Sequence, residues 1–154
     1  LLDFIDFIEG ELLLENIDII LEPEEDLSDV MLDPKLFRHV MINLVKNSRE
    51  AMEKGGTIEI ITKTLAEDSI GLRVRDNGRG IKKEDQSDIF NAFYTDKEHG
   101  TGLGLSFSRQ ITEGHNGRIK VESEPGKGAA FIIILPAIKG KENQKDDQIR
   151  GKNG

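Results

Sequence analysis

The sequence predicts an α+β fold, a two-layer α/β sandwich in which a mixed, mostly antiparallel sheet of about five strands packs on three helices. Three stretches carry apolar residues at helical spacing, and several short stretches alternate apolar and polar residues as half-buried strands do. A chain of 154 residues can bury one core without disulfides, and this chain contains no cysteine. We therefore expect one ordered domain over residues 1–138, followed by a disordered polar tail over residues 139–154.

The N-terminal third of the chain predicts a helix, two strands and the start of a longer helix. Apolar residues recur at helical spacing over residues 1–13. Residues 17–21 predict a strand, and residues 30–32 predict a second, short strand. Asp33 and Pro34 then predict the start of the longer helix, because Asp is a preferred N-cap and Pro fits the first helical position.

The longer helix has one apolar face and one polar face. The positions expected to be buried are Leu36, Phe37, Val40, Met41, Leu44, Val45, Ser48, Ala51 and Met52. On the polar side, Asn43, Asn47 and Glu50 fall at positions i, i+4 and i+7, so they share one face. Their oxygen atoms are of the kind that Mg²⁺ prefers, although a solvated helix face would carry the same residues.

The second half of the chain predicts four strands and one more helix. Alternating patterns indicate antiparallel strands over residues 57–65 and 70–75, each with one buried face. A helix is expected over residues 103–114, and a final strand pair over residues 118–123 and 129–135. The residues of that helix expected to face inward are Leu105, Ile111 and either Phe107 or Ser108.

Two glycine-rich motifs separate these elements. Residues 76–81 read Asp-Asn-Gly-Arg-Gly-Ile and directly follow a predicted strand, where a carboxylate can accept a hydrogen bond from the exocyclic amine of adenine. Residues 100–105 read Gly-Thr-Gly-Leu-Gly-Leu and open a predicted helix, where bared backbone N–H groups can hold phosphate oxygens. Taken singly, the first motif also fits an ordinary turn and the second a flexible hinge.

The order of these motifs between residues 43 and 104 resembles the catalytic and ATP-binding domain of sensor histidine kinases. That family belongs to the GHKL superfamily, or Bergerat fold, which also holds DNA gyrase, heat-shock chaperone ATPases and MutL mismatch-repair ATPases. The resemblance covers residues 17–136. Residues 43–52 resemble the N box, 76–81 the G1 box, 89–94 the F box, 100–105 the G2 box, and 126–131 the last glycine-rich segment.

The resemblance implies that the chain binds ATP with Mg²⁺ and that a flexible lid, from about residue 86 to residue 100, closes over the nucleotide. By resemblance, Asn43 and Asn47 take part in catalysis, and Asn47 coordinates Mg²⁺. Lys97 in the lid could reach the γ-phosphate and is a further candidate for catalysis, although a solvated lid charge would look the same. The nucleotide-binding residues would be Asn47, Glu50, Asp76, Gly78, Gly80, Ile81, Thr101, Gly102, Leu103, Gly104 and Leu105. The chain departs from the family pattern at Ser48, where Ala is usual, and at Ala92, where Pro is usual.

Position 43 separates two kinds of chemistry. The hydrolysing members of the superfamily carry there a Glu that activates water, whereas an amide such as Asn43 cannot act as a general base near neutral pH. The chain is therefore expected to transfer the γ-phosphoryl group. None of His39, His99 and His115 is followed by an acidic residue, as the acceptor histidine of this family usually is. We expect the acceptor on a separate dimerisation and phospho-acceptor domain, with a response regulator as an indirect partner.

The composition excludes other functions. The net charge is −8 without a dense basic cluster, which argues against nucleic-acid binding. The longest apolar run, residues 129–135, is far shorter than the ~20 residues that span a bilayer. We expect this domain to be cytoplasmic and monomeric, and a longer protein that contains it could be anchored in a membrane through other regions. Two alternatives share the motifs: a serine kinase of the anti-sigma-factor type, and a nucleotide-sensing module without transfer activity.

Overall fold

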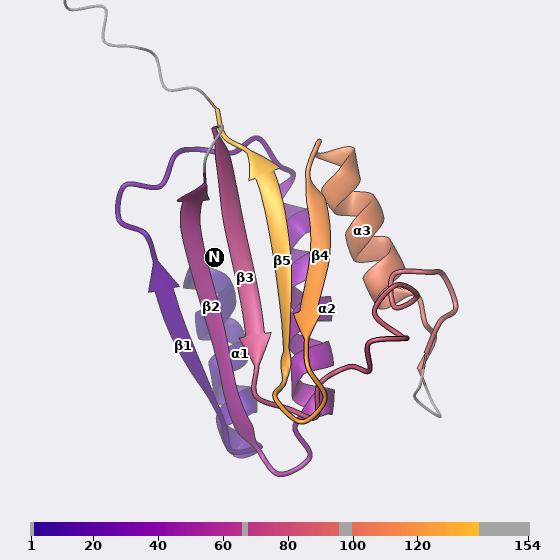
Figure 1. The fold of residues 1–154 in the computed structure, drawn as a ribbon. Helices are drawn as coiled ribbons and strands as arrows, with labels where there is room; N and C mark the ends of the chain where they lie inside the picture. The colour runs from indigo at the N-terminus through magenta and orange to yellow at the C-terminus, as the bar shows by residue number, and fades with distance from the viewer. Residues whose placement is uncertain (1, 66–67, 96–99, 139–154) are drawn as a thin grey trace, which may run out of the picture.

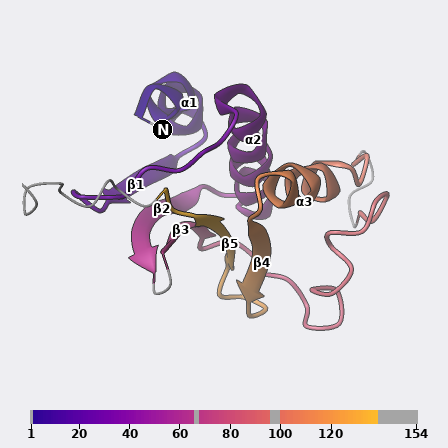
Figure 2. The same ribbon diagram turned by 90° about the horizontal axis from the view of Figure 1, so that it is seen from above.

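Three helices cover one face of a five-stranded sheet in the computed structural model, which describes residues 2–65, 68–95 and 100–138 (Figure 1). Seen from above, the helices form one layer and the strands the other (Figure 2). The elements in chain order are α1 (Leu2–Leu14), β1 (Ile17–Pro23), α2 (Pro34–Ala51), β2 (Gly56–Leu65), β3 (Ser69–Asp76), α3 (Gly104–Gly114), β4 (Arg118–Ser123) and β5 (Ala129–Pro136). The predicted two-layer α+β sandwich is confirmed.

The sheet is mixed and mostly antiparallel, as predicted. Its strand order is β1-β2-β3-β5-β4. Only β1 and β2 among these neighbours are parallel, and the other three pairs are antiparallel. Helix α2 makes the crossover between the two parallel strands, because a parallel pair cannot be joined by a tight turn. Helix α2, which carries the N-box residues, therefore packs against one face of the sheet.

The expected strand over residues 30–32 is wrong. Val30 forms only an isolated antiparallel bridge with Ala137, and the Ile138 N–H donates to the Asp29 carbonyl at 2.7 Å. Met31 is exposed. This segment is too short for a ladder because Asp33 already caps α2, its carboxylate accepting hydrogen bonds from the N–H groups of the first turn.

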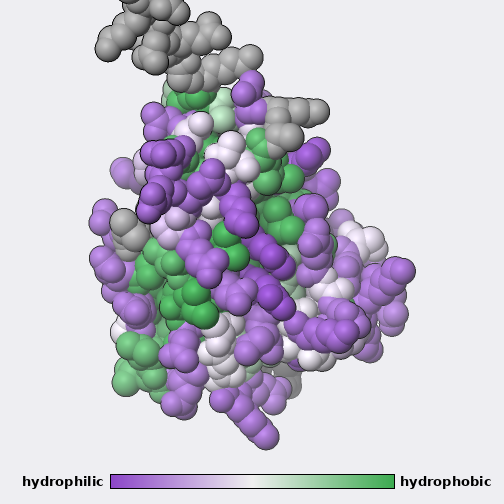
Figure 3. Space-filling model, turned by 60° about the vertical axis from the view of Figure 1, so that its left-hand side comes forward, coloured by the Kyte–Doolittle hydropathy of each residue, from purple (hydrophilic) through white to green (hydrophobic). Residues whose placement is uncertain are grey.

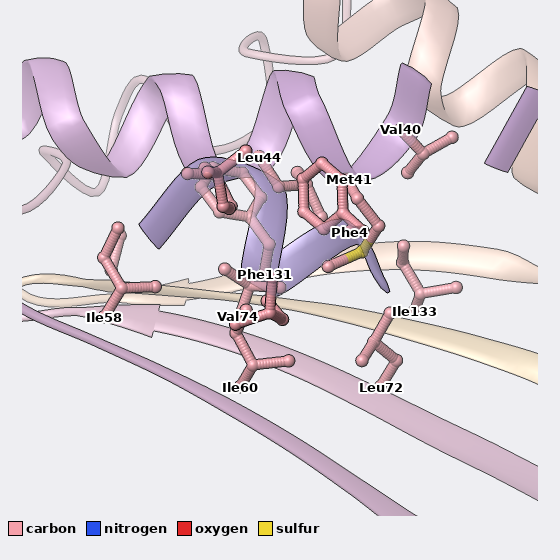
Figure 4. Packing of buried hydrophobic residues seen from close by; sticks show 14 of the residues in the cluster. Phe4, Val40, Met41, Leu44, Ile58, Ile60, Leu72, Val74, Phe131 and Ile133 are labelled. Carbon is pink, nitrogen blue, oxygen red and sulfur yellow. The ribbon is translucent and has the colours of Figure 1, made fainter. Parts of the chain in front are cut away.

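The core lies between α2 and the inner face of the sheet (Figure 4). The alternation predicted for β2 and β3 is confirmed, since Ile58, Ile60, Leu72 and Val74 are buried. Phe131 and Ile133 of β5 complete that face, and Val40, Met41 and Leu44 of α2 pack against it (Figure 4). Helix α3 turns Ser108 and Ile111 inward and leaves Phe107 exposed, which decides between the two residues that the periodicity left open.

The outer surface is mixed in character. On the side that carries β1, hydrophobic side chains gather in separate patches between hydrophilic ones (Figure 3). In the part of the chain that the structure describes, no helix has the length and hydropathy needed to cross a membrane.

Phe90, from the predicted F box, packs edge-on against Phe131 with ring centroids 6.3 Å apart, which ties the segment after the first glycine-rich motif to the core.

Candidate nucleotide-binding site

The polar face of α2 contacts the start of α3 through Asn43. Its Nδ2 donates hydrogen bonds to the Gly104 carbonyl at 3.2 Å and to the Ser108 Oγ at 3.3 Å. The Ser108 hydroxyl in turn donates to the same carbonyl at 2.9 Å. The N-box helix and the second glycine-rich motif, separated by some sixty residues in sequence, therefore lie side by side.

Asn47 and Glu50 follow Asn43 on α2, and both are half-buried. A Glu50 carboxylate oxygen lies 3.9 Å from the Lys46 Nζ. Among the described residues there is no group of three His, Cys, Asp or Glu side chains that could hold a metal by itself. The amide and carboxylate oxygens of Asn47 and Glu50 fit Mg²⁺ instead, because this ion commonly takes one or two protein oxygens and completes its shell with water and phosphate.

Asp76 ends β3 and is buried, with 2% of its surface exposed. Its Oδ1 accepts hydrogen bonds from the Gly78 N–H at 2.9 Å and from the Ala129 N–H at 3.3 Å. Burial raises the pKa of Asp76 above its ordinary value of 3.8, while these two N–H groups, the nearby Ser48 hydroxyl and Arg75 act to lower the pKa. The carboxyl is thus a buried hydrogen-bond acceptor that two backbone N–H groups hold in place.

The loop after β3 lies between the end of α2 and the β4–β5 hairpin and forms backbone hydrogen bonds with both. The Arg79 N–H donates to the Ala51 carbonyl at 3.0 Å, and the Arg79 carbonyl accepts from the Gly126 N–H at 2.7 Å. Gly80 has a φ of +73°, and a Cβ there would collide with the Glu124 carbonyl oxygen. The glycines of this motif therefore serve close backbone packing beside Asp76.

Three bracing side chains were not predicted as part of the site. The Ser123 Oγ accepts from the Ile81 N–H at 2.8 Å, and the Gln86 Nε2 donates to the Ile81 carbonyl at 3.0 Å and the Ser123 carbonyl at 2.9 Å. Gln86, placed by sequence at the start of the lid, is thus an anchor for Ile81. Ser108 is the third bracing residue. A serine or glutamine carries no sequence signal that would identify such contacts, which depend on the strand order.

The second glycine-rich motif opens α3 without a side-chain cap. Gly102 has a φ of +67°, a Cβ there would collide with the Phe93 backbone, and its carbonyl accepts from the Phe93 N–H at 2.9 Å. No side-chain hydrogen bond caps the helix at Leu103. Thr101 and Leu103 are exposed, whereas Leu105 packs against the core. An uncapped helix N-terminus offers N–H groups and a positive dipole to an anion.

A pocket of about 470 Å³ lies where α2, α3 and the first part of the predicted lid meet. Its lining residues are His39, Asn43, Ala92, Phe93, Leu103, Gly104, Ser106, Phe107 and Gln110. A second cavity, of about 140 Å³, lies between α1 and α2 and is lined by none of the predicted nucleotide-binding residues. Of the predicted site, Lys97 and the middle of the lid lie outside the described residues, as do residues 139–154 of the predicted tail.

Comparison with known proteins identifies the family. Residues 32–139 match the family of histidine kinase-, DNA gyrase B- and HSP90-like ATPases. Sporulation kinase E of Bacillus subtilis (strain 168) is 37% identical over 146 residues, which are 95% of this chain and 20% of that protein. The chain therefore spans about a fifth of the length of this relative.

Solved structures agree with the sequence comparison. The catalytic domain of histidine kinase ThkA superimposes with a TM-score of 0.78 at 33% identity, covering 88% of each chain. ThkA in complex with the response regulator protein TrrA gives a TM-score of 0.74 at 30% identity, covering 91% of this chain and 40% of that one. The chain belongs to the histidine kinase-, DNA gyrase B- and HSP90-like ATPase family and is the ATP-binding catalytic domain of a histidine kinase.

Proposed function

We propose that this domain holds Mg²⁺-ATP between α2, the end of β3 and the start of α3, and donates the γ-phosphoryl group to a histidine on a separate dimerisation and phospho-acceptor domain. In the transfer, an imidazole nitrogen of the acceptor attacks the γ-phosphorus, the bond to the β–γ bridging oxygen breaks, and ADP leaves. Positioning and charge stabilisation carry such a reaction, so the domain needs no nucleophile of its own.

The observation that carries this proposal is the Asn43 amide. Its Nδ2 donates to the Gly104 carbonyl and to Ser108, so the side chain at this position ties α2 to the uncapped start of α3. An amide has no basicity with which to activate water near neutral pH. The arrangement supports holding the triphosphate for transfer to another molecule rather than hydrolysing it.

The roles of the remaining predicted residues follow from their positions. Asp76 would accept from the adenine amine, the N–H groups of residues 102–105 would hold the phosphates, and Asn47 with Glu50 would hold Mg²⁺. The ion, when bound, neutralises charge on the phosphate oxygens. Lys97 stays a proposed γ-phosphate contact.

The comparisons support histidine rather than serine as the acceptor, because ThkA, which is similar to this chain over 88% of both chains, is named a histidine kinase. The complex of ThkA with TrrA supports a response regulator as the downstream partner of the whole kinase. Dependence on ATP supports a cytoplasmic site of action. A monomeric state is expected of this domain by itself, and sedimentation of the 154-residue chain measures it.

Transfer to a separately supplied acceptor domain of the same kinase tests the proposal. Radiolabelled ATP should place an acid-labile, base-stable label on that domain. Asp76→Asn and Asn47→Ala should each slow the labelling at least about tenfold, because the first places an amide against the adenine amine and the second removes the proposed oxygen ligand of Mg²⁺. Lys120→Ala, on the outer face of β4, is the matched control and should transfer normally. Acid-stable label would indicate serine, and normal transfer by both site variants would refute the pocket.

A further inference from the structure

The Ser108 hydroxyl on α3 lies buried between two polar groups of the proposed site. Ser108 is 0% exposed, and its Oγ donates to the Gly104 carbonyl at 2.9 Å. The Nδ2 of Asn43, on α2, donates to this Oγ at 3.3 Å and to the same carbonyl at 3.2 Å. Asn43 and Gly104 both line the pocket of about 470 Å³. Ser108 therefore takes part in a closed group of three hydrogen bonds with two residues of the pocket wall.

These bonds fix which end of the Asn43 amide faces α3. A backbone carbonyl can only accept a hydrogen bond, so the amide atom that faces the Gly104 carbonyl must be the nitrogen. The Ser108 hydroxyl gives its one proton to that carbonyl, so toward Asn43 it can only accept as well. A half-turn of the amide would therefore break two hydrogen bonds in a part-buried position.

The oxygen of the same amide is left for the pocket. Both hydrogen bonds of Asn43 start at Nδ2, and within residues 2–65, 68–95 and 100–138 no group donates to its Oδ1. Asn47 follows one turn later on α2, and the uncapped start of α3 lies beside Asn43. An amide oxygen is a ligand of the kind that Mg²⁺ takes in proteins. The Asn43 Oδ1 therefore lies beside the place proposed for the ion and the phosphates.

We propose that Ser108 is a positioning residue for phosphoryl transfer, because it keeps the amide nitrogen of Asn43 turned toward α3 and the amide oxygen turned toward Mg²⁺ or a water bound to that ion. The inference rests on the proposed binding of Mg²⁺-ATP in this site. Without the hydroxyl, a half-turn of the amide would break one hydrogen bond instead of two. The oxygen would then face the ion for a smaller fraction of the time.

The side-chain amide protons of Asn43 test this geometry without any nucleotide. In proton–nitrogen correlation spectra of the 154-residue chain, Ser108→Ala should speed their exchange with water about tenfold, the range for one lost hydrogen bond. Thr112→Val is the matched control, because the Thr112 hydroxyl is equally buried on α3 but donates to the Ser108 carbonyl, at 2.8 Å, and not to Asn43. Unchanged exchange in Ser108→Ala, or an equal acceleration in Thr112→Val, would overturn the assignment.

Titration calorimetry with ATP, in Mg²⁺ and in EDTA, tests the effect on the ion. Ser108→Ala should weaken ATP binding in Mg²⁺ about fivefold and leave binding in EDTA unchanged, because only the Mg²⁺ complex uses the Asn43 oxygen. In an Asn43→Ala background, Ser108→Ala should cause no further loss, because Ser108 acts through Asn43. Equal losses with and without Mg²⁺, or a further loss in that background, would contradict the proposed role.

The two measurements separate this inference from the proposed function. Failure of the wild type to bind Mg²⁺-ATP would refute the proposed function and, with it, the role given to Ser108. Normal wild-type binding together with unchanged amide exchange in Ser108→Ala would refute only the assignment of Ser108.

Discussion

The Asp76 carboxyl, proposed to bind the adenine base, is a buried charge that lowers the stability of the fold. It is 2% exposed, and burial raises its pKa above 3.8, so the folded chain holds this charge less readily than the unfolded chain does. Because the folded pKa is the higher one, the charged carboxylate opposes folding increasingly as the pH rises from 3.8 through the raised pKa, and the opposition is then constant. The buried Asp76 carboxylate, the proposed acceptor for the adenine amine, therefore lowers the stability of the fold above its raised pKa.

Asp76→Asn should therefore separate stability from binding. The amide oxygen can keep both hydrogen bonds, from Gly78 and Ala129, without a buried charge. We expect a melting temperature at pH 7 equal to or above that of the wild type, a difference that narrows as the pH falls toward 3.8, and loss of ATP binding. Thermal melts at several pH values and calorimetry measure these effects. A clearly lower melting temperature at pH 7 would contradict the sign derived from the raised pKa.

At the scale of elements, one imidazole joins the two helices that carry the site. His115 ends α3, where its Nδ1 bonds with the Ile111 carbonyl at 2.7 Å. Its Nε2 accepts from the Asp33 N–H, at the N-cap of α2, at 2.9 Å. Together with the contact from Asn43 to Gly104, this bond joins α2 and α3 at two separate points. The proposed phosphate site at the start of α3 lies beside the second of these contacts, the one from Asn43 to Gly104.

His115→Ala should lower the free energy of unfolding by about 1–2 kcal/mol, because it leaves the Asp33 N–H and the end of α3 without their partner. Urea unfolding of the 154-residue chain measures the change. His39→Ala, an exposed histidine on α2, is the matched control and should change stability by less than about 0.5 kcal/mol. Equal effects of the two substitutions would show that the bond between the helices contributes nothing.

For the molecule as a whole, one core supports every part of the site. Leu44 is 0% exposed on α2 and points from that helix toward the inner face of the sheet (Figure 4). The same helix presents Asn43 and Asn47 on its polar side. The position of the site therefore depends on how α2 sits on the sheet.

Leu44→Ala should cost about 2–5 kcal/mol of unfolding free energy, the range for emptying a well-packed core position. Ile42→Ala, two residues earlier on α2 and 40% exposed, should cost less than about 1 kcal/mol. Chemical denaturation of both variants measures the difference. Comparable losses would mean that the core does not close around α2 in the way described.

Much of the fold followed from local patterns. The N-cap at Asp33, the stripe on α2 and the alternation in β2 and β3 are signals carried within short stretches, and the structure has them. The one wrong position in the stripe is Leu36, which lies in the first turn of α2 and is 39% exposed. The expected strand over residues 30–32 failed because pairing depends on what lies opposite, and among the described residues Val30 pairs only with Ala137, in an isolated bridge. The bracing of Ile81 by Gln86 and Ser123 could not be predicted for the same reason, since it requires two segments to meet.

The sequence by itself determined the class of the protein: an ATP-binding domain with an amide, Asn43, where a water-activating carboxylate would stand. Those features depend only on which residues are present and how they are spaced, and both can be read from the sequence. Only the tertiary structure decided that Asn43 binds the start of α3, that His115 joins the helix ends, and that Gln86 and Ser123 hold Ile81. Such contacts depend on strand order and helix packing, because the energy of a hydrogen bond depends on distance and burial rather than on separation in sequence.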